Sequence, residues 1–511
     1  MLSLVKSYAL YGLNGIPVEV EVDVNPNCDD DALSIVGLPD AAVKESKDRV
    51  RSAIRNSGAK VPKGAITINL APADVKKEGA SLDLAIACAI IKNADKTCVR
   101  DLGDLFMLGE LSLEGKIRKV SGVLPMVLSA KENGFKRVII PYDNAKEAAL
   151  VDGIEVYGAE TLKEVIAFMR GEEMNVFPHT SFKPERGENA FGSDLKYVKG
   201  QFAAKRALEV AVSGGHNMLM TGAPGAGKTM LAKCIPTIMP DMTFEEALET
   251  TAIHSVYGDM SFDGVVTSRP FVTPHHTASS VSLIGGGSSI KPGLISLAHN
   301  GVLYLDEMPE YPRGALECLR QPLEDGMVTV SRARGNVRYP AEFMLVASMN
   351  PCPCGNLGSD NPAKKCTCTD TQIRKYRSRI SGPLLDRIDI QVQVDGVNYE
   401  DLSSKEEAEP SEKVRARVNK ARMIQAERFS SDGILLNARM KESHLAKYCA
   451  LDSKCEEILK NSFKTLGLSA RARSRILKVA RTIADLDYSE NIQKKHLLEA
   501  IGYRSLDNNE V

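Results

Sequence analysis

The pattern of hydrophobic and polar positions divides the chain into three regions. Residues 1–168 combine alternating stretches, such as VEVEVDV at 18–24, with an amphipathic stretch at 41–58, and this predicts a domain of mixed helices and strands. Between 196 and 395, short apolar runs alternate with helical stretches, which is typical of a parallel sheet flanked by helices. Residues 411–509 have helical periodicity and predict a small helical domain.

Two polar segments separate these regions. Residues 169–195 contain two prolines and lack apolar periodicity, and residues 397–410 are acidic and poor in strand signals. Both segments have the composition of linkers. The predicted fold class is therefore α/β and multidomain, with an α+β domain at 1–168, a parallel-sheet domain at 196–395 and a helical domain at 411–511.

The composition of the chain indicates where the protein is found in the cell, and it says less about the reaction that the protein catalyses. The 511 residues carry a formal net charge of −1, so no overall field favours a polyanionic partner, although a local basic patch can still bind nucleic acid. No apolar run approaches the roughly 18 residues of a membrane span, and the N-terminus lacks the features of a signal peptide. We therefore expect a cytoplasmic protein without a membrane partner. Its eleven cysteines would be reduced, which makes clustered cysteines candidates for metal binding.

The strongest chemical signal is a glycine-rich loop between a predicted strand, which ends at Thr221, and a predicted helix. The next eight residues match the phosphate-binding pattern G-x-x-x-x-G-K-[ST]: Gly222, Ala223, Pro224, Gly225, Ala226, Gly227, Lys228 and Thr229. The backbone N–H groups of such a loop and the N-terminus of the following helix attract phosphates. We expect Lys228 to reach the β- and γ-phosphates of ATP and Thr229 to bind Mg²⁺. The alternative is an ordinary glycine-rich turn.

Two further predicted strands end in polar residues suited to the same chemistry. GVLYLDE ends in Asp306 and Glu307, and AEFMLVASMN ends in Asn350. In a phosphoryl-transfer site, Asp306 would hold Mg²⁺ through water, and Glu307 would orient and polarise the attacking water. Asn350 can contact the γ-phosphate or that water. A strand that ends in an ordinary acidic turn is the alternative for the two carboxylates.

Arginines nearer the C-terminus are candidates for contacting the γ-phosphate. SGPLLDRIDI places Arg387 after a short predicted helix, from which it can reach the ATP of a neighbouring subunit as an arginine finger. A surface ion pair with Asp386 or Asp389 is the alternative. In the helical domain, Arg471 and Arg475 lie on one helical face. Arg471 can fold back over the phosphates, or the two arginines can form a solvated basic face.

Four cysteines form two CxC pairs within residues 352–368. Cys352, Cys354, Cys366 and Cys368 supply the four thiolates of a closed tetrahedral Zn²⁺ site. The spacing departs from the common CxxC knuckle, so an iron–sulfur cluster, a redox dithiol pair and unliganded thiols remain alternatives. We expect a zinc clip that pins a small loop. This loop joins Asn350 to Arg387. Loss of the zinc clip is therefore expected to weaken assembly or cooperativity more than nucleotide binding.

Two segments of the central region bear on the substrate. Residues 326–343 alternate on both sides of Arg334-Gly335-Asn336 and predict a β-hairpin. Residues 251–300 contain His275 and His276, whose side chains would point to opposite faces of an extended segment and so rarely share a metal ion. We favour a structural role for the two histidines. The glycine run in the same segment, LIGGGSSIKPG, suggests a loop that contacts the substrate.

Together, these motifs resemble those of the AAA+ ATPases. Longer segments, such as VKGQFAAKRALEVAVSGGHNMLMTGAPGAGKTMLA, PGLISLAHNGVLYLDEMPE and RSRISGPLLDRIDI, are similar to the magnesium-chelatase-like subgroup, and nearly the whole chain resembles the ComM/YifB family. The resemblance implies a homo-oligomeric ring, predicted to be a hexamer, with ATP bound between subunits and Arg387 acting on the neighbour's nucleotide. That family includes a DNA helicase that promotes branch migration during natural transformation.

The resemblance also places the predicted hairpin in the central channel of the ring. Arg332, Arg334 and Arg338 would then line the channel and track a phosphate backbone without reading bases. The expected partner is branched or single-stranded DNA. A solvated hairpin whose arginines pair with carboxylates is the alternative.

The N-terminal region resembles the protease domain of Lon, which has the fold of ribosomal protein S5 domain 2, and the similar domain of RadA. APADVKKEGASLDLAIACAI places Ser81 at the position of Lon's nucleophile, and LGELSLEGKIRKVSGVLP places Leu124 where Lon has its catalytic lysine. A serine without a base is a poor nucleophile at neutral pH. We therefore expect a non-proteolytic scaffold in which Ser81 caps a helix predicted over 81–92.

The sequence thus predicts an ATP-hydrolysing motor on DNA that uses ATP, Mg²⁺ and a structural Zn²⁺ and drives branch migration or strand separation. Two other classes remain open. A metal-insertion ATPase like the magnesium chelatase motor subunit lacks the Lon-like domain. A protein-remodelling or proteolytic machine would more often have an aromatic channel loop and, for proteolysis, a lysine in place of Leu124.

Overall fold

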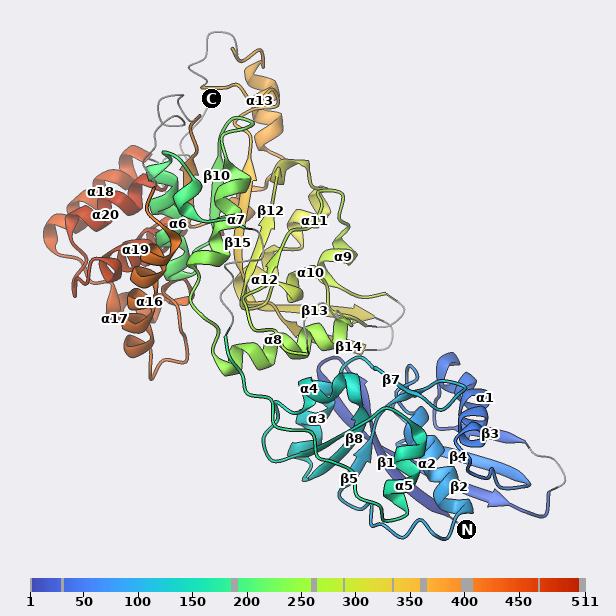
Figure 1. The fold of residues 1–511 in the computed structure, drawn as a ribbon. Coiled ribbons are helices and arrows are strands. Elements are labelled where there is room, and N and C mark those ends of the chain that lie inside the picture. The colour runs from blue at the N-terminus through green and yellow to red at the C-terminus, as the bar shows by residue number, and fades with distance from the viewer. Residues whose placement is uncertain are drawn as a thin grey trace.

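The computed structural model describes residues 2–28, 32–184, 192–258, 264–287, 290–332, 335–358, 365–396, 408–466 and 469–504. Figure 1 shows an N-terminal part built on one sheet, a central part built on a second sheet, and a C-terminal helical part packed against the central one. The predicted linkers fall partly outside the described residues, at 185–191 and 397–407. Among the helices that are described, none combines the length and the apolar character needed to cross a membrane.

A seven-stranded mixed sheet forms the N-terminal part, in the order β3-β4-β2-β1-β5-β8-β9. The strands are β1 (Ser3–Tyr11), β2 (Asn14–Asn25), β3 (Leu33–Val36), β4 (Ala65–Ala71), β5 (Leu105–Met107), β8 (Arg137–Pro141) and β9 (Glu155–Ala159). A small separate pair joins β6 (Glu110–Leu111) and β7 (Ile117–Arg118). The alternation that predicted a strand at 18–24 places Val18, Val20 and Val22 of β2 in the core, because successive side chains point to opposite faces of a sheet.

The helices of the N-terminal part are α1 (Ala41–Asn56), α2 (Asp83–Ala94), α3 (Val123–Glu132), α4 (Ala145–Ala148) and α5 (Leu162–Met169). The side chain of Asp40 caps α1 by accepting a hydrogen bond from the backbone N–H of Val43. The predicted cap of α2 is wrong. This helix begins at Asp83, with Leu82 in the capping position and no side-chain cap. Asp83 is buried and accepts hydrogen bonds from Arg49 and from the backbone of Leu111, so Ser81 is left two residues before the helix.

The central sheet is entirely parallel, in the order β11-β12-β15-β10-β16. Its strands are β11 (Phe271–Val272), β12 (Val302–Leu305), β15 (Met344–Met349), β10 (Met218–Thr221) and β16 (Ile390–Gln393). Helices cover both faces, so the strands are apolar on both sides. Met218 and Met220 join one core, whereas Leu219 faces the other.

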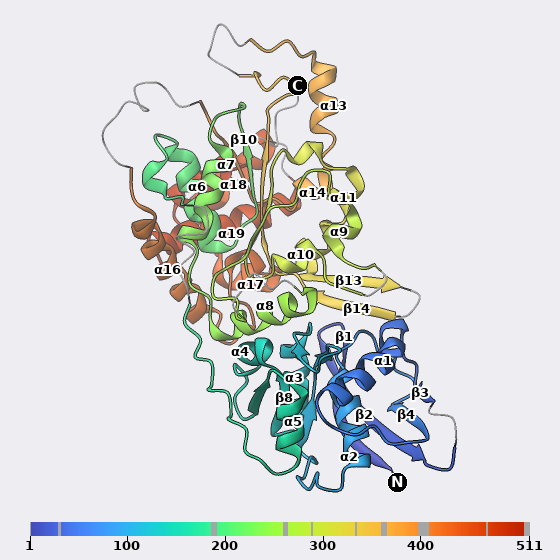
Figure 2. The same cartoon turned by 45° about the vertical axis from the view of Figure 1, so that its right-hand side comes forward.

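The helices of the central part are α6 (Phe202–Gly214), α7 (Lys228–Ile238), α8 (Phe244–Tyr257), α9 (Ser280–Ile284), α10 (Leu294–Leu297), α11 (Arg313–Glu317), α12 (Arg320–Asp325), α13 (Asp370–Arg377) and α14 (Gly382–Leu385). The antiparallel pair β13 (Met327–Arg332) and β14 (Gly335–Pro340) stands apart from the main sheet. In Figure 2 this hairpin extends sideways between the central sheet and the N-terminal part.

The C-terminal part consists of α16 (Ser411–Arg428), α17 (Glu442–Tyr448), α18 (Ser453–Leu466), α19 (Ala470–Leu486) and α20 (Lys494–Gly502). It shares one apolar core with α6, α7 and one face of the central sheet. Buried polar contacts fix the packing. His216 contacts Thr482 of α19 at 2.8 Å and Asp389 at 3.3 Å. Burial alone would raise the pKa of Asp389, but the hydrogen bond to His216 and the charge of Arg475 lower it.

Helix α8 forms the junction between the N-terminal and central parts. The backbone N–H of Gly122 donates to the carbonyl of Ser255 at 2.9 Å, and the Ser255 hydroxyl donates to the carboxylate of Glu147 at 2.7 Å. Burial raises the pKa of Glu147, although hydrogen bonds from Ser255 and Asn144 oppose this. The junction therefore contains satisfied polar groups as well as apolar contacts such as Ala252 of α8.

Candidate ATP-binding and hydrolysis site

The glycine-rich loop leaves β10 at Thr221 and enters α7 at Lys228, as the motif predicts. Gly225 and Gly227 have φ angles of +81° and +92°, a backbone region that favours glycine. At Gly222, a Cβ atom would lie 2.2 Å from the carbonyl oxygen of Val394, so a larger residue does not fit there either. The loop therefore brings its backbone N–H groups to the start of a helix, which is the arrangement that binds phosphate.

Lys228 lies over the loop rather than in solvent. Its Nζ atom donates to the carbonyls of Gly222 at 2.5 Å and Ala223 at 3.0 Å, and to Oδ1 of Asn350 at 3.2 Å. Burial lowers the pKa of Lys228, while the nearby carboxylates of Asp306 and Glu307 oppose the shift. Lys228 and Asn350, which are 122 positions apart in sequence, are thus in direct contact, because β10 and β15 are neighbours in the sheet.

Thr229 and Asp306 form a second contact at the same edge. The Thr229 hydroxyl donates to Oδ2 of Asp306 at 3.0 Å, and the Ser348 hydroxyl donates to Oδ1. Burial alone would raise the pKa of Asp306, but these hydrogen bonds lower it, so the group is an anion at neutral pH. A hydroxyl and a carboxylate beside a phosphate loop are the ligands that Mg²⁺ takes in such sites. The residues present therefore fit ATP with Mg²⁺.

Ser348 is the residue of this site that sequence reasoning missed. It lies in β15, which pairs in parallel with β12 through the register Leu305↔Ala347. The residues that follow this pair, Asp306 after β12 and Ser348 in β15, are therefore neighbours. The polar serine within the apolar run LVASMN was the available signal, because a buried hydroxyl requires a hydrogen-bond partner.

Glu307 has an unusual backbone conformation. Its φ angle is +52°, a left-handed conformation that is uncommon for a residue other than glycine. The backbone N–H donates to the hydroxyl of Ser348 at 3.2 Å, and the side chain is exposed. Such strain is frequent at functional sites. Here it turns the chain directly after β12, so that the carboxylate is free at the edge where Asp306 lies.

Arg387 lies at the opposite edge of the same sheet. It precedes β16, and its carbonyl accepts a hydrogen bond from Asn217, the residue before β10, at 2.9 Å. The phosphate loop follows β10, and a four-residue strand spans about 13 Å. The guanidinium pairs with Glu324 and donates from Nη1 to the carbonyl of Pro383 at 2.8 Å. The ion pair of Arg387 is therefore with Glu324 and not with Asp386 or Asp389.

Arg471 also lies at that opposite edge. Its guanidinium is 3.6 Å from the carboxylate of Asp386, next to Arg387, and its side chain is 68% exposed. Arg475, one helical turn later, contacts Asp389 at 3.4 Å. In this arrangement the lid helix α19 carries Arg471 beside Arg387 instead of over the phosphate loop of the same subunit. The expectation that Arg471 folds back over its own phosphates does not match this position.

The four cysteines converge. The Sγ atom of Cys352 is 3.4 Å from that of Cys354 and 3.6 Å from that of Cys366, and all four sulfur atoms lie within 4.8 Å of one another. With Zn–S bonds of about 2.3 Å, a tetrahedral site has sulfur–sulfur separations of about 3.8 Å. Backbone N–H groups of Asn356 and Thr367 lower the pKa of Cys354 to about 6, whereas burial and the neighbouring thiols raise the pKa of Cys366 and Cys368. This donor set fits a closed four-thiolate zinc site.

The cysteine cluster also touches the phosphate loop, which the sequence did not reveal. Gly355, between the two pairs, has a φ angle of +77°, and a Cβ atom there would lie 2.5 Å from Cδ of Pro224. On the other side, Nη2 of Arg377 donates to the carbonyl of Pro351 at 3.4 Å. The cluster is therefore placed against the loop that follows β10 as well as within the connection from Asn350 to Arg387.

The predicted hairpin forms, with a slightly different turn. β13 and β14 pair from Met327↔Pro340 to Arg332↔Gly335, so Gly335-Asn336 belongs to β14. Arg338 is exposed. Arg332 ends β13, and Arg334 lies outside the described residues. Val337 of β14, which pairs with Val330, is buried and packs against the N-terminal part, where a Cβ atom on Gly12 would lie 2.4 Å from its Cγ1.

The paired histidines are arranged differently from the expectation. The ring centroids of His275 and His276 are 4.1 Å apart, so the two side chains do not point to opposite faces. The reason is a turn, in which the backbone N–H of Ala278 donates to the carbonyl of His275 at 2.8 Å. Within the parts of the chain that the structure describes, no third ligand joins them, and the only metal-competent group is the cysteine cluster.

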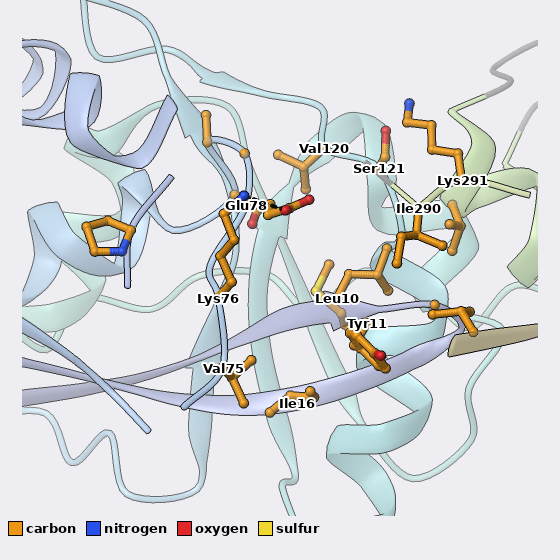
Figure 3. Close-up of a pocket in the computed structure, with 18 of the residues that line it drawn as sticks. Leu10, Tyr11, Ile16, Val75, Lys76, Glu78, Val120, Ser121, Ile290 and Lys291 are labelled. Carbon is orange, nitrogen blue, oxygen red and sulfur yellow. Dashed lines mark hydrogen bonds and ion pairs between the residues drawn. The ribbon is translucent and has the colours of Figure 1, made fainter. Parts of the chain in front are cut away.

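A large cavity of about 1130 Å³ lies at the junction of the N-terminal and central parts, away from the phosphate loop. Figure 3 shows Leu10 and Tyr11 from β1, Lys76 and Glu78 from the segment before α2, and Ile290 and Lys291 from the central part around it. Ser81 and Lys119 also line this cavity. Leu124, the position of the Lon lysine, is fully buried in α3.

Comparisons with known proteins agree with this organisation. Family models described as magnesium chelatase, subunit ChlI, as subunit ChlI of Mg-chelatase and as the ChlI C-terminal region match residues 194–402, 20–144 and 408–504. Lon protease 2 of Bacillus subtilis is 32% identical over 198 residues, which cover 35% of this chain and 34% of that protein. This partial similarity agrees with a Lon-like N-terminal region.

Two relatives match over almost their whole length. YifB of Escherichia coli is 42% identical over 511 residues, which cover 99% of this chain and 97% of that protein. The competence protein ComM of Haemophilus influenzae is also 42% identical, over 99% of this chain and 98% of that protein. With a phosphate loop, an Asp306–Thr229 pair and a parallel five-stranded sheet, this chain therefore belongs to the YifB/ComM family of magnesium-chelatase-like AAA+ proteins, as its sequence motifs predicted.

Proposed function

We propose that this protein is an ATP-hydrolysing ring motor that acts on DNA. The hydrolysis chemistry is supported by the side chains gathered at the carboxyl edge of the central sheet. Lys228 and the loop N–H groups would bind the β- and γ-phosphates, and Thr229 with Asp306 would hold Mg²⁺, which neutralises the charge that develops on the phosphates. Glu307 would orient the attacking water, and Asn350 would contact the γ-phosphate.

The observation that carries the ring proposal is the separation of Arg387 from its own phosphate loop. One lies before β16 and the other after β10, at opposite edges of one sheet. An arginine finger raises phosphoryl-transfer rates by about 10³–10⁵-fold when it reaches the γ-phosphate. Arg387 can do so only on a neighbouring subunit. A head-to-tail interface forms a ring when the rotation from one subunit to the next closes, and we propose a homohexamer.

DNA is proposed as the substrate on two grounds. The hairpin β13–β14 carries the exposed Arg338, and the sequence of this segment adds Arg332 and Arg334, a density of positive charge suited to a phosphate backbone. The second ground is the full-length similarity to a protein named for competence. Branched or single-stranded DNA is the proposed partner, and helicase or branch-migration activity in recombination or natural transformation is the proposed result.

Each region of the chain is proposed to have its own role. Residues 1–168 would form a non-proteolytic scaffold, since buried Leu124 supplies no base for Ser81. Residues 196–395 would form the motor domain and residues 411–511 the lid. The cluster at 352–368 would hold Zn²⁺, because its four sulfur atoms lie within 4.8 Å of one another.

Forked DNA is expected to bind the protein and to raise its ATPase rate, whereas unfolded protein is not. Arg338→Ala is expected to lower this stimulation severalfold and to leave the DNA-free rate unchanged, because the exposed guanidinium contacts phosphates and not ATP. Steady-state ATPase rates with and without each polymer give the answer. Lys460→Ala, which removes an exposed cation from α18, is the control. If forked DNA neither binds nor stimulates while Lys228→Ala still abolishes hydrolysis, the proposal is wrong.

Replacing Cys352 and Cys354 together by serine is expected to remove zinc and to weaken ATP binding severalfold as well as assembly. The contact of Gly355 with Pro224 is the reason, and it revises the expectation that assembly or cooperativity would weaken more than nucleotide binding. Metal analysis and nucleotide titration measure the two effects. Cys28→Ser with Cys98→Ser is the matched control, since neither thiol belongs to the cluster. A parent protein that holds no zinc, or a variant that binds ATP as tightly as the parent, would contradict the expectation.

A further inference from the structure

We infer that Glu324 holds Arg387 in a resting position and thereby links the DNA-facing hairpin to ATP hydrolysis in the neighbouring subunit. Nothing in the motif pattern of the chain assigns a role to Glu324. The inference rests on the proposed action of Arg387 across the subunit interface and adds a positioning residue to it.

The contacts of the Arg387 guanidinium are the first step. Nη2 pairs with the carboxylate of Glu324, and Nη1 donates to the carbonyl of Pro383 at 2.8 Å. Nε is buried and has no hydrogen-bond partner. Both outer nitrogen atoms are thus engaged within the subunit. A guanidinium binds a phosphate through two such N–H groups in a fork, so Arg387 must release Glu324 before it can contact a neighbour's γ-phosphate in that way.

The two side chains of this ion pair differ in their exposure to solvent. The Arg387 side chain is 16% exposed, whereas that of Glu324 is 66% exposed. The carboxylate of Glu324 therefore lies largely in solvent, which weakens its ion pair with Arg387. A contact of that strength is sufficient to bias the arginine and weak enough for a γ-phosphate with its larger charge to displace. This is the behaviour expected of a competing anion, and a buried ion pair would not provide it.

The position of Glu324 in the chain connects this pair to the hairpin. Glu324 lies in the last turn of α12, Gly326 ends that helix with a φ angle of +67°, and β13 begins at Met327. The backbone N–H of Ala341, just after β14, donates to the carbonyl of Gly326 at 2.8 Å. Both strands of the hairpin are therefore anchored at the end of α12. Force on the hairpin acts on the helix turn that carries Glu324, and release of Arg387 frees that turn.

The structure thus gives Arg387 two alternative anions, the carboxylate of Glu324 in its own subunit and the γ-phosphate of the next. Without DNA, the intrasubunit pair holds the finger back and slows turnover. When DNA displaces the hairpin, the last turn of α12 moves, the pair opens, and Arg387 becomes available. Glu324 acts through Arg387 and touches neither nucleotide nor DNA.

Glu324→Gln is the test, because it removes the charge and keeps the shape. The DNA-free ATPase rate of the assembled protein is expected to rise about fivefold, the factor that corresponds to loss of a partly exposed ion pair, and stimulation by forked DNA is expected to fall towards unity. Glu324→Asp, which keeps the charge, should remain closer to the parent in both respects. Glu456→Gln is the matched control, since Glu456 is an exposed carboxylate paired with Arg473 at 3.8 Å in the lid.

An unchanged or lower DNA-free rate for Glu324→Gln, in a protein that assembles and melts like the parent, overturns the inference. The Arg387→Ala background separates this failure from failure of the proposed function. If Arg387→Ala itself keeps the parent rate, the action of Arg387 between subunits is wrong. If Arg387→Ala abolishes turnover but Glu324→Gln has no effect beside an intact Arg387, only the role of Glu324 is wrong. In the double variant, Glu324→Gln should produce no acceleration, because the two residues act as one unit.

Discussion

Lys228→Ala is expected to lower the ATPase rate by at least about 100-fold, the effect of removing a major charge-stabilising donor from a transition state. The ammonium group of Lys228 is held over the loop by the carbonyls of Gly222 and Ala223 and by Asn350. The site therefore positions this cation before ATP arrives. Steady-state phosphate release with saturating ATP and Mg²⁺ measures the loss.

Lys233→Ala provides the control for this variant. Lys233 lies on the same helix, α7, with its side chain exposed. Its replacement by alanine therefore changes the net charge and the composition of the helix as much as Lys228→Ala does, and it leaves the loop intact. We expect it to keep the parent rate. A Lys228→Ala protein that hydrolyses ATP within a few-fold of the parent would show that this loop is not the hydrolytic site.

Arg387→Ala is expected to leave ATP binding intact and to reduce turnover by about 10³-fold, the lower end of the range for an arginine finger. The reason is the sheet geometry. Arg387 is at the amino edge, tied to Asn217, and the phosphate loop is at the carboxyl edge. The nucleotide that a subunit binds therefore makes no contact with its own Arg387. Equilibrium binding of a fluorescent ATP analogue, measured beside the hydrolysis rate, separates the two effects.

Mixing two inactive variants tests the intersubunit role directly. In an equal mixture, a phosphate loop from Arg387→Ala can lie next to an intact Arg387 from a Lys228→Ala subunit. Random assembly of a ring would restore roughly a quarter of the interfaces, since each must combine one subunit of each kind in the right order. Lys228→Ala protein assembled without the second variant should stay inactive. Absence of any recovery in assembled mixtures would contradict action between subunits. Arg473→Ala, which alters an exposed lid arginine, should remain active alone.

The N-terminal part shows the limits of local signals. The alternation in β2 and the amphipathic stretch at 41–58 predicted their elements because both patterns depend on residues within a few positions of one another. The start of α2 did not follow Ser81, because Asp83 is drawn inward by Arg49 and by the backbone of Leu111. These two partners are far apart in sequence from Asp83, and no local pattern reveals them.

The sequence by itself determined the phosphate loop, the strand ends at Asp306 and Asn350 and the family. Each is encoded in a short run, since a loop needs glycines at fixed offsets and a buried strand needs a continuous apolar stretch. Only the tertiary structure decided which of these runs meet. The order of the parallel strands places Ser348 beside Asp306, sends Arg387 to the opposite edge with Glu324, and lays the cysteine loop against Pro224. Those contacts depend on which strands become neighbours and in which register, and the free energy that fixes this order comes from burying both faces of the sheet at once. No single segment contains that information.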